Sequence, residues 1–594
     1  MEQFEKSMGI ESSSEANGFI SLEKKVETEV QEVTIEQSAT ASPNENDDGF
    51  TNSRFFKTIT KLSNKLDSLG VESNGIDRVS PDERGSRGRQ LLHVSGLWLS
   101  ATGGLSSMST FLLGPLLFEL TLKQSLISGL ISMFIGCLVA AYCSIMGPQS
   151  GCRQMVTARF LFGWWFVKFV ALAAITGVMG WSVVNSVVGG EMLASISNDK
   201  VPLWIGVVIV TICSFLVATF GIKQVLKVET YFAVPVLTCF LLLYISASDK
   251  FYMLNDIDNS EVDRSTIKGN WLSFFSLCYS VTSTWGSIAA DYYILFPEDA
   301  PNYQVFLLTF LGIFLPTLFV SVLGMLLATV AATYKPWHDM YDKYGMGGLL
   351  HAGFERWNGF GKFCVVVLIL SLISNNIVNT YSAAFSIQLS SVHLARIPRW
   401  IWCICCTVVY LVCALVGRNH FSTILSNFLP MIGYWISMYF IILFEENEIF
   451  RRHYLKLYTK EFPNEDSTKV EDRETRDTLS LTGDSVIGGA KEESSQHAYT
   501  SIHELKRRHR STRHRYNWAA WDDNEVLTHG YAATAAFLIG VAGVVIGMAQ
   551  TYWIGPIARK IGEFGGDLGM WLSMGFSGLA YPPLRYWELR RYGR

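Results

Sequence analysis

The sequence predicts an all-α integral membrane protein of about 12 transmembrane helices, and three observations lead to this prediction. Apolar stretches of about 20 residues, the length that spans a hydrocarbon core, recur along the chain. Charged residues make up 17% of the chain, whereas an average soluble protein has about 25%. Two apolar stretches, residues 97–118 and 271–296, carry Ser, Thr and Gly near their centres, which favours an interrupted helix.

The apolar stretches and the polar segments between them define the predicted organisation of the chain. The predicted spans cover residues 93–118, 125–147, 165–194, 203–221, 231–247, 271–297, 304–332, 361–391, 400–417, 421–446, 530–552 and 566–584. We expect a disordered cytoplasmic N-terminal tail at 1–90, a first five-helix repeat at 91–247, a second at 271–446, a cytoplasmic linker at 447–525, and the last two helices with the C-terminus at 526–594.

The interrupted stretches are the first and the sixth predicted spans. In lipid, unwound backbone is tolerated only where it is buried in protein or lines a polar cavity. Two five-span units in opposite orientation, each opening with a broken helix, form the inverted repeat typical of secondary transporters, whose binding sites lie at the breaks. The predicted site residues at these breaks are Ser100, Thr102, Gly103 and Gly104 in span one, and Trp285 and Ser287 in span six.

The distribution of basic and acidic residues predicts the orientation in the membrane. Basic residues gather at one set of predicted span ends, whereas the loop at 250–268, on the opposite side, carries four acids. The positive-inside rule therefore places both termini in the cytoplasm, and an even number of spans agrees. The basic positions at the predicted inner ends are Arg84, Arg87, Arg89, Arg153, Arg159, Lys223, Lys227, Arg396, Arg399, Arg451, Arg452 and the cluster Lys506 to Arg515.

Carboxamides and one indole lie inside the predicted spans. Trp181 and Asn185 are four residues apart on one helix face, which suits either a platform for a flat polar ring or ordinary helix packing. Span eight carries Asn375, Asn376 and Asn379, and each amide can donate and accept hydrogen bonds. Bonding between helices is expected for at least one of them. On the same span, Ser371 and Ser374 could coordinate a cation or a water molecule.

Two acids inside spans are candidates for proton coupling, because carboxylates within a membrane are costly and commonly functional. Asp291 lies near the end of span six, where a helix cap or a pair with Lys is the alternative. Glu191 lies at the end of span three, and an interfacial position near the outer mouth is the preferred interpretation.

Several functions are excluded by what the sequence lacks. It has no Gly-rich phosphate loop and no metalloprotease helix, so we expect neither an enzyme nor an ATP-driven pump. The 11 cysteines lie mostly inside spans without zinc-ligand spacing, so no metal or cofactor is expected apart from a co-transported proton. No cleavable signal peptide and no nucleic-acid-binding feature are evident. The segment 463–500 is a passive linker or a target of kinases or ubiquitin ligases, and Lys506 to Arg515 could contact anionic membrane lipids.

Several motifs resemble the nucleobase–cation symporter-1 family, in its fungal purine–cytosine permease branch. The matching stretches are LWLSAT (97–102), GCRQMVTARFLFG (151–163), GWSVVN (180–185), AADYYILFP (289–297), SNNIVNTY (374–381) and GMAQTYWIGPIARKIGEFGGDLG (547–569). The resemblance implies a LeuT-like fold of ten core helices plus two, and proton-coupled uptake by alternating access. The family's ligand-contacting positions fall on Ser100, Trp181, Asn185, Trp285, Asn375, Asn376 and Asn379.

Departures from the cytosine permeases bear on the substrate. Those permeases carry Asn at the position of Thr102 and Pro at that of Val378, and they lack the Gly103–Gly104 pair. The stretches LSATGGLSSMS, MGPQSGCRQMV and TWGSIAADYYILFPED are instead similar to the vitamin B6 permease type of the branch. This resemblance implies uptake of pyridoxine, pyridoxal and pyridoxamine across the plasma membrane. The alternatives are a purine or cytosine permease of the same family, and a receptor-like nutrient sensor.

Overall fold

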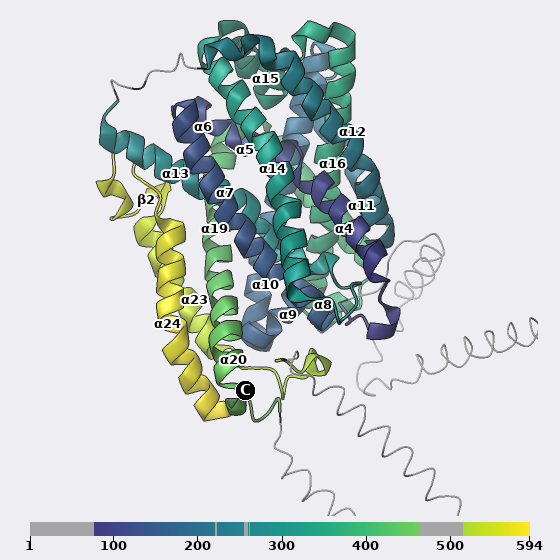
Figure 1. Ribbon diagram of the computed structural model, residues 1–594, viewed down its shortest axis with the longest axis vertical. Helices are drawn as coiled ribbons and strands as arrows, with labels where there is room; N and C mark the ends of the chain where they lie inside the picture. The colour runs from purple at the N-terminus through teal and green to yellow at the C-terminus, as the bar shows by residue number, and fades with distance from the viewer. Residues whose placement is uncertain (1–75, 220–221, 255–258, 260–261, 463–514) are drawn as a thin grey trace, which may run out of the picture. The chain divides into compact units, whose positions relative to one another are not determined.

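The computed structural model describes residues 76–219, 222–254, 259, 262–462 and 515–594, and this part of the chain is a bundle of helices (Figure 1). By length and composition, seven of the described helices are able to cross a membrane: Leu122–Ser150, Arg159–Ser197, Val225–Met253, Asn302–Thr333, Glu355–Leu389, Arg399–His420 and Ser422–His453. Shorter apolar helices cover Leu105–Leu116, Leu203–Ala218 and Tyr531–Gly547. The prediction of an all-helical membrane protein is confirmed.

The first predicted repeat is built from nine helical segments that follow a short 3₁₀ turn at Pro81–Glu83. They are α4 (Arg87–Thr102), α5 (Leu105–Phe111), α6 (Leu113–Leu116), α7 (Leu122–Ser144), α8 (Met146–Ser150), α9 (Gln154–Thr157), α10 (Arg159–Ser197), α11 (Leu203–Ala218) and α12 (Ile222–Ala247). A 3₁₀ turn at Ser248–Met253 follows α12.

The second predicted repeat begins with α13 and ends with α19. Its elements are α13 (Arg264–Ser283), the 3₁₀ turns η3 (Thr284–Ser287) and η4 (Ala289–Tyr292), α14 (Asn302–Thr333), α15 (Lys335–Gly353), η5 (Glu355–Trp357), α16 (Asn358–Leu389), α17 (Val392–Ala395), α18 (Arg399–Gly417), η6 (Arg418–His420) and α19 (Phe421–Glu445).

The remaining elements surround the end of α19 and form a separate helix pair. They are a π turn at Glu446–Phe450, α20 (Arg451–His453), η8 (Leu455–Leu457), η9 (Trp518–Ala520), α23 (Tyr531–Gly547), the hairpin strands β1 (Ala549–Gln550) and β2 (Trp553–Ile554), η10 (Ala558–Lys560) and α24 (Gly569–Tyr592). The helices α23 and α24 pack against each other and against α19 at one side of the bundle (Figure 1).

Both predicted interruptions are present. Span one stops at Thr102 and restarts at Leu105, and Gly104 between them is fully extended. Span six stops at Ser283 and continues as two 3₁₀ turns instead of an α-helix. Tighter turns free backbone groups from the regular helical pattern, and here those groups are buried inside the protein.

Three differences from the predicted spans matter most for the rest of the structure. Helix α12 begins at Ile222 instead of 231, so that Lys227 and Glu229 belong to a helix and not to a loop. Helix α15 was not predicted, because its polar residues resemble a loop, and it bends at Tyr344 and Gly345. Helix α23 ends at Gly547 instead of 552, where the chain turns into the β1–β2 hairpin.

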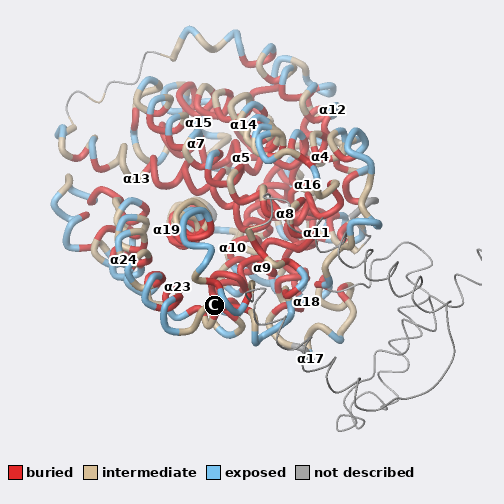
Figure 2. The backbone as a smooth tube through the Cα atoms, turned by 60° about the horizontal axis from the view of Figure 1, so that its bottom comes forward, coloured by how far each residue is buried: buried red, intermediate tan, exposed pale blue. Residues whose placement is uncertain are grey.

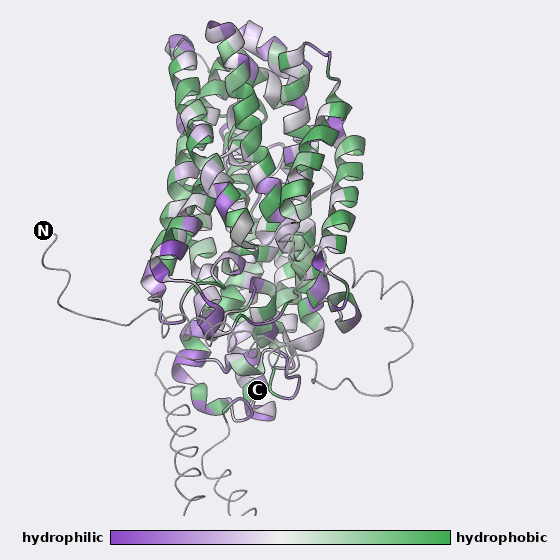
Figure 3. Cartoon of the chain, turned by 90° about the vertical axis from the view of Figure 1, so that its right-hand side faces the viewer, coloured by the Kyte–Doolittle hydropathy of each residue, from purple (hydrophilic) through white to green (hydrophobic). Residues whose placement is uncertain are grey.

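The ends of the bundle carry the polar residues, and the middle carries the apolar core. Hydrophobic residues predominate along the middle of the helices, and hydrophilic residues gather towards the two ends of the bundle (Figure 3). Figure 2 shows buried residues in the centre of the bundle and exposed ones on the outer faces of α23 and α24. In Figure 1, α15 lies at one end, whereas α8, α9, α20 and the C-terminus lie at the other.

The end that carries the C-terminus also carries residues predicted to lie in the tail and the linker. Residues 76–90 are ordered there, since Arg78 Nε donates to Ser150 O (2.7 Å) and Arg84 Nη1 donates to Pro148 O (2.6 Å). Residues 76–90 are therefore not part of a disordered tail, and the rest of the predicted tail, 1–75, lies outside the described residues. Likewise 463–500 and residues 506–514 of the basic cluster lie outside them. Arg515, the last residue of that cluster, donates from Nη1 to Asn447 O (3.0 Å), and Tyr458 and Trp518, near the linker ends, are buried.

Candidate functional site

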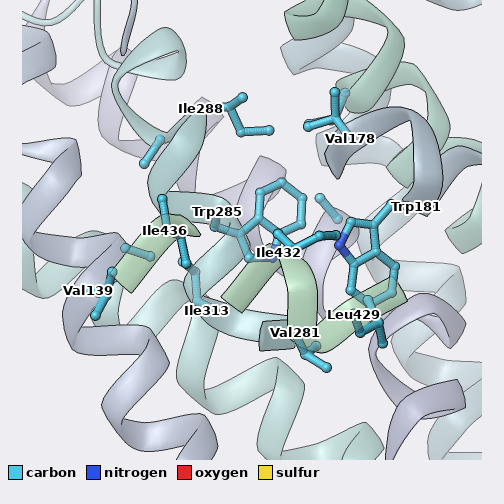
Figure 4. Packing of buried hydrophobic residues seen from close by; sticks show 14 of the residues in the cluster. Val139, Val178, Trp181, Val281, Trp285, Ile288, Ile313, Leu429, Ile432 and Ile436 are labelled. Carbon is cyan, nitrogen blue, oxygen red and sulfur yellow. The ribbon is translucent and has the colours of Figure 1, made fainter. Parts of the chain in front are cut away.

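A cavity lies where the two interrupted spans meet, with an empty volume of about 310 Å³. Its walls come from both predicted repeats: α5 and α10 from the first, and α13, η3 and α16 from the second. Trp181 and Trp285 lie together with Val178, Val281 and Ile288 in this region (Figure 4). The lining residues are Ser106, Ser107, Val178, Trp181, Val281, Thr284, Trp285, Ile288, Asn375 and Asn379.

One indole of the cavity, that of Trp285, is held by a residue outside the cavity wall. Trp285 lies edge-on against Trp98, with ring centroids 5.4 Å apart and an interplanar angle of 89°. Trp98 is itself fixed, because its Nε1 donates to the Tyr293 hydroxyl (3.1 Å). Edge-to-face pairs of this kind stabilise a ring orientation beyond the burial of its area. The face of Trp285 is therefore pre-oriented, and Trp98 is a supporting residue that sequence reasoning did not single out.

The carboxamides form one hydrogen-bonded network behind the cavity wall. Asn185 Nδ2 donates to Asn375 Oδ1 (2.8 Å) and to Asn376 Oδ1 (3.0 Å), and its Oδ1 accepts from Ser106 Oγ (2.5 Å). Asn379 Nδ2 also donates to Asn375 Oδ1 (2.8 Å). Asn375 and Asn379 line the cavity, whereas Asn185 and Asn376 hold the network in place from outside the lining.

Span one is attached to span eight on both sides of its break. Asn375 Nδ2 donates to Ala101 O (3.0 Å), and the Leu105 amide donates to Ser371 Oγ (3.1 Å). Ser100 Oγ and Ser374 Oγ lie 2.8 Å apart and share a hydrogen bond. The backbone groups released by the break are thus satisfied by α16 and not by lipid.

The glycine pair at the break allows two close approaches. A Cβ on Gly103 would lie 2.8 Å from Pro316 Cβ of α14, and a Cβ on Gly104 would lie 2.8 Å from Ser371 Cβ of α16. Either side chain would push a neighbouring helix away. We conclude that these glycines set the spacing of the break and contribute no surface to the cavity.

Three more predicted site residues face away from the cavity. Thr102 Oγ1 donates to Trp98 O (2.6 Å) and approaches Gly312 O of α14 (3.2 Å). Ser287 Oγ donates to Thr284 O (2.7 Å) within its own turn. Ser100 Oγ shares a hydrogen bond with Ser374 Oγ and interacts with Glu229, and it does not line the cavity. The helix faces that these residues occupy follow from tertiary packing, which spacing along the sequence does not determine.

Sequence reasoning missed three polar lining residues, Ser106, Ser107 and Thr284. Ser106 and Ser107 follow the break in span one, in the stretch GLSSMS, and Thr284 is the first residue of η3. A signal was present, because small hydroxyl residues directly after an interruption lie on the new, rotated segment. The apolar lining residues Val178, Val281 and Ile288 carry no such signal.

Asp291 lies among the contacts that hold η4 against α9, at the end of the bundle that carries the C-terminus. Its Oδ1 accepts from the Gln154 backbone amide (2.8 Å), and Gln154 Oε1 accepts from the Ala290 amide (3.1 Å). Gln154 Nε2 donates to the Tyr439 hydroxyl (2.8 Å). The guanidinium of Arg153 lies over the Phe385 ring at 3.2 Å. Asp291 therefore ties η4 to α9 and does not line the cavity.

Glu191 belongs to the opposite closure, under α15. Its Oε2 accepts from the Gly347 amide (3.4 Å), and it lines a polar cavity with an empty volume of about 1170 Å³. In the same cavity the Tyr344 hydroxyl donates to Asp199 Oδ2 (2.8 Å), which together with Lys343 lowers the pKa of Asp199. Glu191 therefore lies beside a polar cavity at the α15 end, and the interpretation of it as an interfacial residue near the outer mouth stays a prediction.

A third buried acid, Glu229 on α12, was not among the predicted site residues. It is fully buried and accepts a hydrogen bond from Ser374 Oγ, next to Ser100 at the break. Residues 222–230 are polar enough to be read as a loop, so this acid fell outside the predicted span five. A signal existed in its spacing, since Val225, Leu226 and Glu229 share one helix face.

Two interrupted helices that meet around an aromatic and amide-lined cavity define a LeuT-like secondary transporter, and comparisons with known proteins agree. The family model "Permease for cytosine/purines, uracil, thiamine, allantoin" matches residues 82–465. The chain belongs to this purine–cytosine permease group of the nucleobase–cation symporter-1 family. It is a transporter and not an enzyme.

Two relatives and one solved structure are similar to this chain over most of its length. The vitamin B6 transporter TPN1 of Saccharomyces cerevisiae is 70% identical over 542 residues, 91% of each chain. The purine-cytosine permease fcyB of Emericella nidulans is 31% identical, covering 90% of this chain and 92% of the relative. The fold is similar to that of Mhp1, a nucleobase-cation-symport-1 family transporter solved in a closed conformation. The two structures superimpose with a TM-score of 0.58 at 12% sequence identity, and the match covers 88% of this chain and 96% of Mhp1.

Proposed function

We propose that this protein takes up vitamin B6 across the plasma membrane by proton-coupled alternating access, with both termini in the cytoplasm. The observation that carries the proposal is a cavity with an indole from each predicted repeat and two carboxamides in its wall. Such a wall suits a small planar heteroaromatic ring with polar substituents. The 70% identity with a vitamin B6 transporter, over 91% of both chains, supports pyridoxine and its relatives as that ring.

In this proposal the two indoles and the amides have different roles. Trp181 and Trp285 bind the faces of the ring, whose stacking on an aromatic side chain is worth about 1–3 kcal/mol. Asn375, Asn379 and Thr284 bind its hydroxyl and hydroxymethyl groups. Asn185, Asn376 and Ser100 act indirectly, because their hydrogen bonds position the residues that line the cavity.

Alternating access requires each end of the site to open in turn. Asp291 lies in the closure at the C-terminal end, and Glu191 lies in the closure under α15. We therefore assign both acids to the opening and closing of the site, in place of direct contact with substrate. Loss of the Asp291–Gln154 contact would free η4 and α9, and loss of the Glu191–Gly347 contact would free α15.

The direct test is uptake of labelled pyridoxine into yeast cells that lack their own permease. We expect uptake that increases as the external medium is acidified, at constant sodium. Competition by unlabelled pyridoxal and pyridoxamine should exceed competition by cytosine, adenine and hypoxanthine. Absence of uptake at every acidic pH would refute the substrate, and stronger competition by a nucleobase would favour the family's purine or cytosine transport instead.

A further inference from the structure

A buried carboxylate lies beside the break of span one and is not part of the cavity wall. Glu229 of α12 is fully buried, and its Oε2 accepts from Ser374 Oγ. Among the described residues, its Oε1 has no hydrogen-bond partner. An isolated ionised carboxylate in a low-dielectric interior costs far more than a paired one, so such a group favours binding a proton or a cation.

The neighbouring elements offer Glu229 no charged partner within the described structure. On α4, Arg87 bonds to Gln304, Arg89 is exposed, and His93 lies two turns before Ser100. Lys227 on α12 is exposed, and Lys362 on α16 donates to Ile196 O.

The elements near the other end of α12 also bring no charged partner to Glu229 within the described structure. Lys250 pairs with Asp249 and Glu355, and α14 carries no charged residue along its length. The titratable side chain that interacts electrostatically with Glu229 is the Tyr292 phenol of η4. Charge on Glu229 is therefore balanced only by hydroxyl groups, unless a proton or a cation binds.

Two successive residues of α16 connect this carboxylate to the substrate cavity. Ser374 donates to Glu229 and shares a hydrogen bond with Ser100 on α4. The next residue, Asn375, lines the cavity and donates to Ala101 O, one residue after Ser100. A change in the hydrogen bonding of Glu229 is thus transmitted through one turn of α4 and one turn of α16 to the residues that would bind the ring.

We infer that Glu229 is the site at which the coupled proton binds, an inference that rests on the proposed proton-coupled uptake. The proton forms an O–H bond at the unpartnered Oε1, while Oε2 keeps its hydrogen bond from Ser374. This neutral form stabilises the attachment of α4 to α16 at the break. Release of the same proton to the cytoplasm restores the charge, weakens the packing of α4 against α12 and α16, and lets the site open inward.

The test separates coupling from substrate transport by using the variant Glu229→Gln. Purified protein in liposomes is assayed in two ways with labelled pyridoxine: accumulation driven by an inward proton gradient, and exchange against internal unlabelled pyridoxine without any gradient. We expect Glu229→Gln to lose accumulation above the external concentration and to retain exchange. The matched control is Glu355→Gln, an exposed carboxylate-to-amide change, which should behave as the wild type.

Each other outcome decides the question. If Glu229→Gln accumulates pyridoxine as well as the wild type does, Glu229 is not the coupling site. If the variant loses exchange together with accumulation, the inference fails as well. Both results leave the proposed function standing. If Glu229→Gln does not fold, Glu229→Asp decides, since a retained carboxylate should accumulate pyridoxine with a shifted pH profile, and an unchanged profile would overturn the inference. If the wild-type protein accumulates pyridoxine in response to a sodium gradient and not to a proton gradient, the inference about Glu229 is overturned as well.

Failure of the proposed function gives a different pattern. In that case the wild type neither exchanges nor accumulates pyridoxine. The same two assays are then run with labelled cytosine, and Glu229→Gln is expected to retain exchange and lose accumulation of that ligand. Exchange and accumulation lost together would overturn the inference for the nucleobase too.

Discussion

At the scale of single residues, Trp181 and Trp285 are two nearly buried indoles that line the same cavity. Trp181 is 6% exposed and Trp285 is 7% exposed. They come from different predicted repeats, so a ring held between them would contact both halves of the bundle at once. Binding at this position therefore depends on the two halves being correctly placed.

Replacing either indole by Ala should weaken binding more than any change to the wall's apolar residues. With a stacking energy of about 1–3 kcal/mol per ring face, Trp181→Ala should raise the apparent Kd for pyridoxine about 5- to 150-fold. Trp181→Phe should cost less, since a smaller face remains. Binding by isothermal titration measures both, with exposed Trp165→Ala as the control. An unchanged Kd for Trp181→Ala would exclude stacking.

Asn185 should behave as a positioning residue and not as a ligand. Asn185→Ala leaves Ser106 without its acceptor and removes one donor from Asn375 and one from Asn376, which costs about 1–3 kcal/mol for a buried group left unpaired. We expect a lower Tm even without substrate, measured in detergent, and Asn302→Ala, an exposed amide, as the unchanged control. An unaltered Tm with weakened binding would indicate direct contact instead.

At the scale of elements, the spacing between α4, α14 and α16 is set by the glycines of the break. Gly104→Ala would place a methyl group 2.8 Å from Ser371 Cβ, a separation at which one helix must move. We expect the variant to reach the membrane and to lose most of its pyridoxine uptake. Gly88→Ala, whose Cβ would have no neighbour within 4 Å, is the matched control in the same uptake assay. Normal uptake by Gly104→Ala would mean that the break tolerates a wider spacing.

The breaks could be predicted from sequence, whereas the start of α12 could not. Small polar residues inside an apolar stretch act locally, so the interruption at Gly103–Gly104 follows from the residues that form it. The segment 222–230 carries several polar residues, and the cover provided by α4 and α16 is what buries Val225, Leu226 and Glu229 within it. Local composition therefore missed Glu229, because its burial is a property of the neighbours and not of its own segment.

The same distinction explains which of the predicted site residues lie in the cavity wall. Trp181, Trp285, Asn375 and Asn379 line the cavity. Thr102 and Ser287 do not, since rotation at a break decides which side chains face inward. That rotation depends on contacts with α14 and within η3, which no spacing rule supplies.

At the scale of the whole molecule, the described structure is closed on the side that carries the C-terminus by an N-terminal segment. Arg84 covers the loop after α8: its Nη1 donates to Pro148 O (2.6 Å), and a Cβ on Gly151 would lie 2.3 Å from its Nη2. Arg78 donates to Ser150 O (2.7 Å). Cys152 lies beneath these contacts at 1% exposure, and burial raises the pKa of its thiol to about 12.

Opening of the bundle at this end, which the proposed topology places in the cytoplasm, should therefore expose Cys152. The reactivity of the Cys152 thiol then reports whether this end is closed. At neutral pH the closed protein holds the thiol protonated, and only the thiolate reacts, so labelling should be slow and should rise with pH. Arg84→Ala removes the bond to Pro148 and should speed labelling by a membrane-impermeant methanethiosulfonate in inside-out vesicles. Background from other cysteines is subtracted with Cys152→Ser, and exposed Arg89→Ala serves as the matched control. Equal labelling rates in Arg84→Ala and the wild type would show that the Arg84–Pro148 contact does not keep this end closed. Labelling of Cys152 in right-side-out vesicles would contradict a cytoplasmic location for this end.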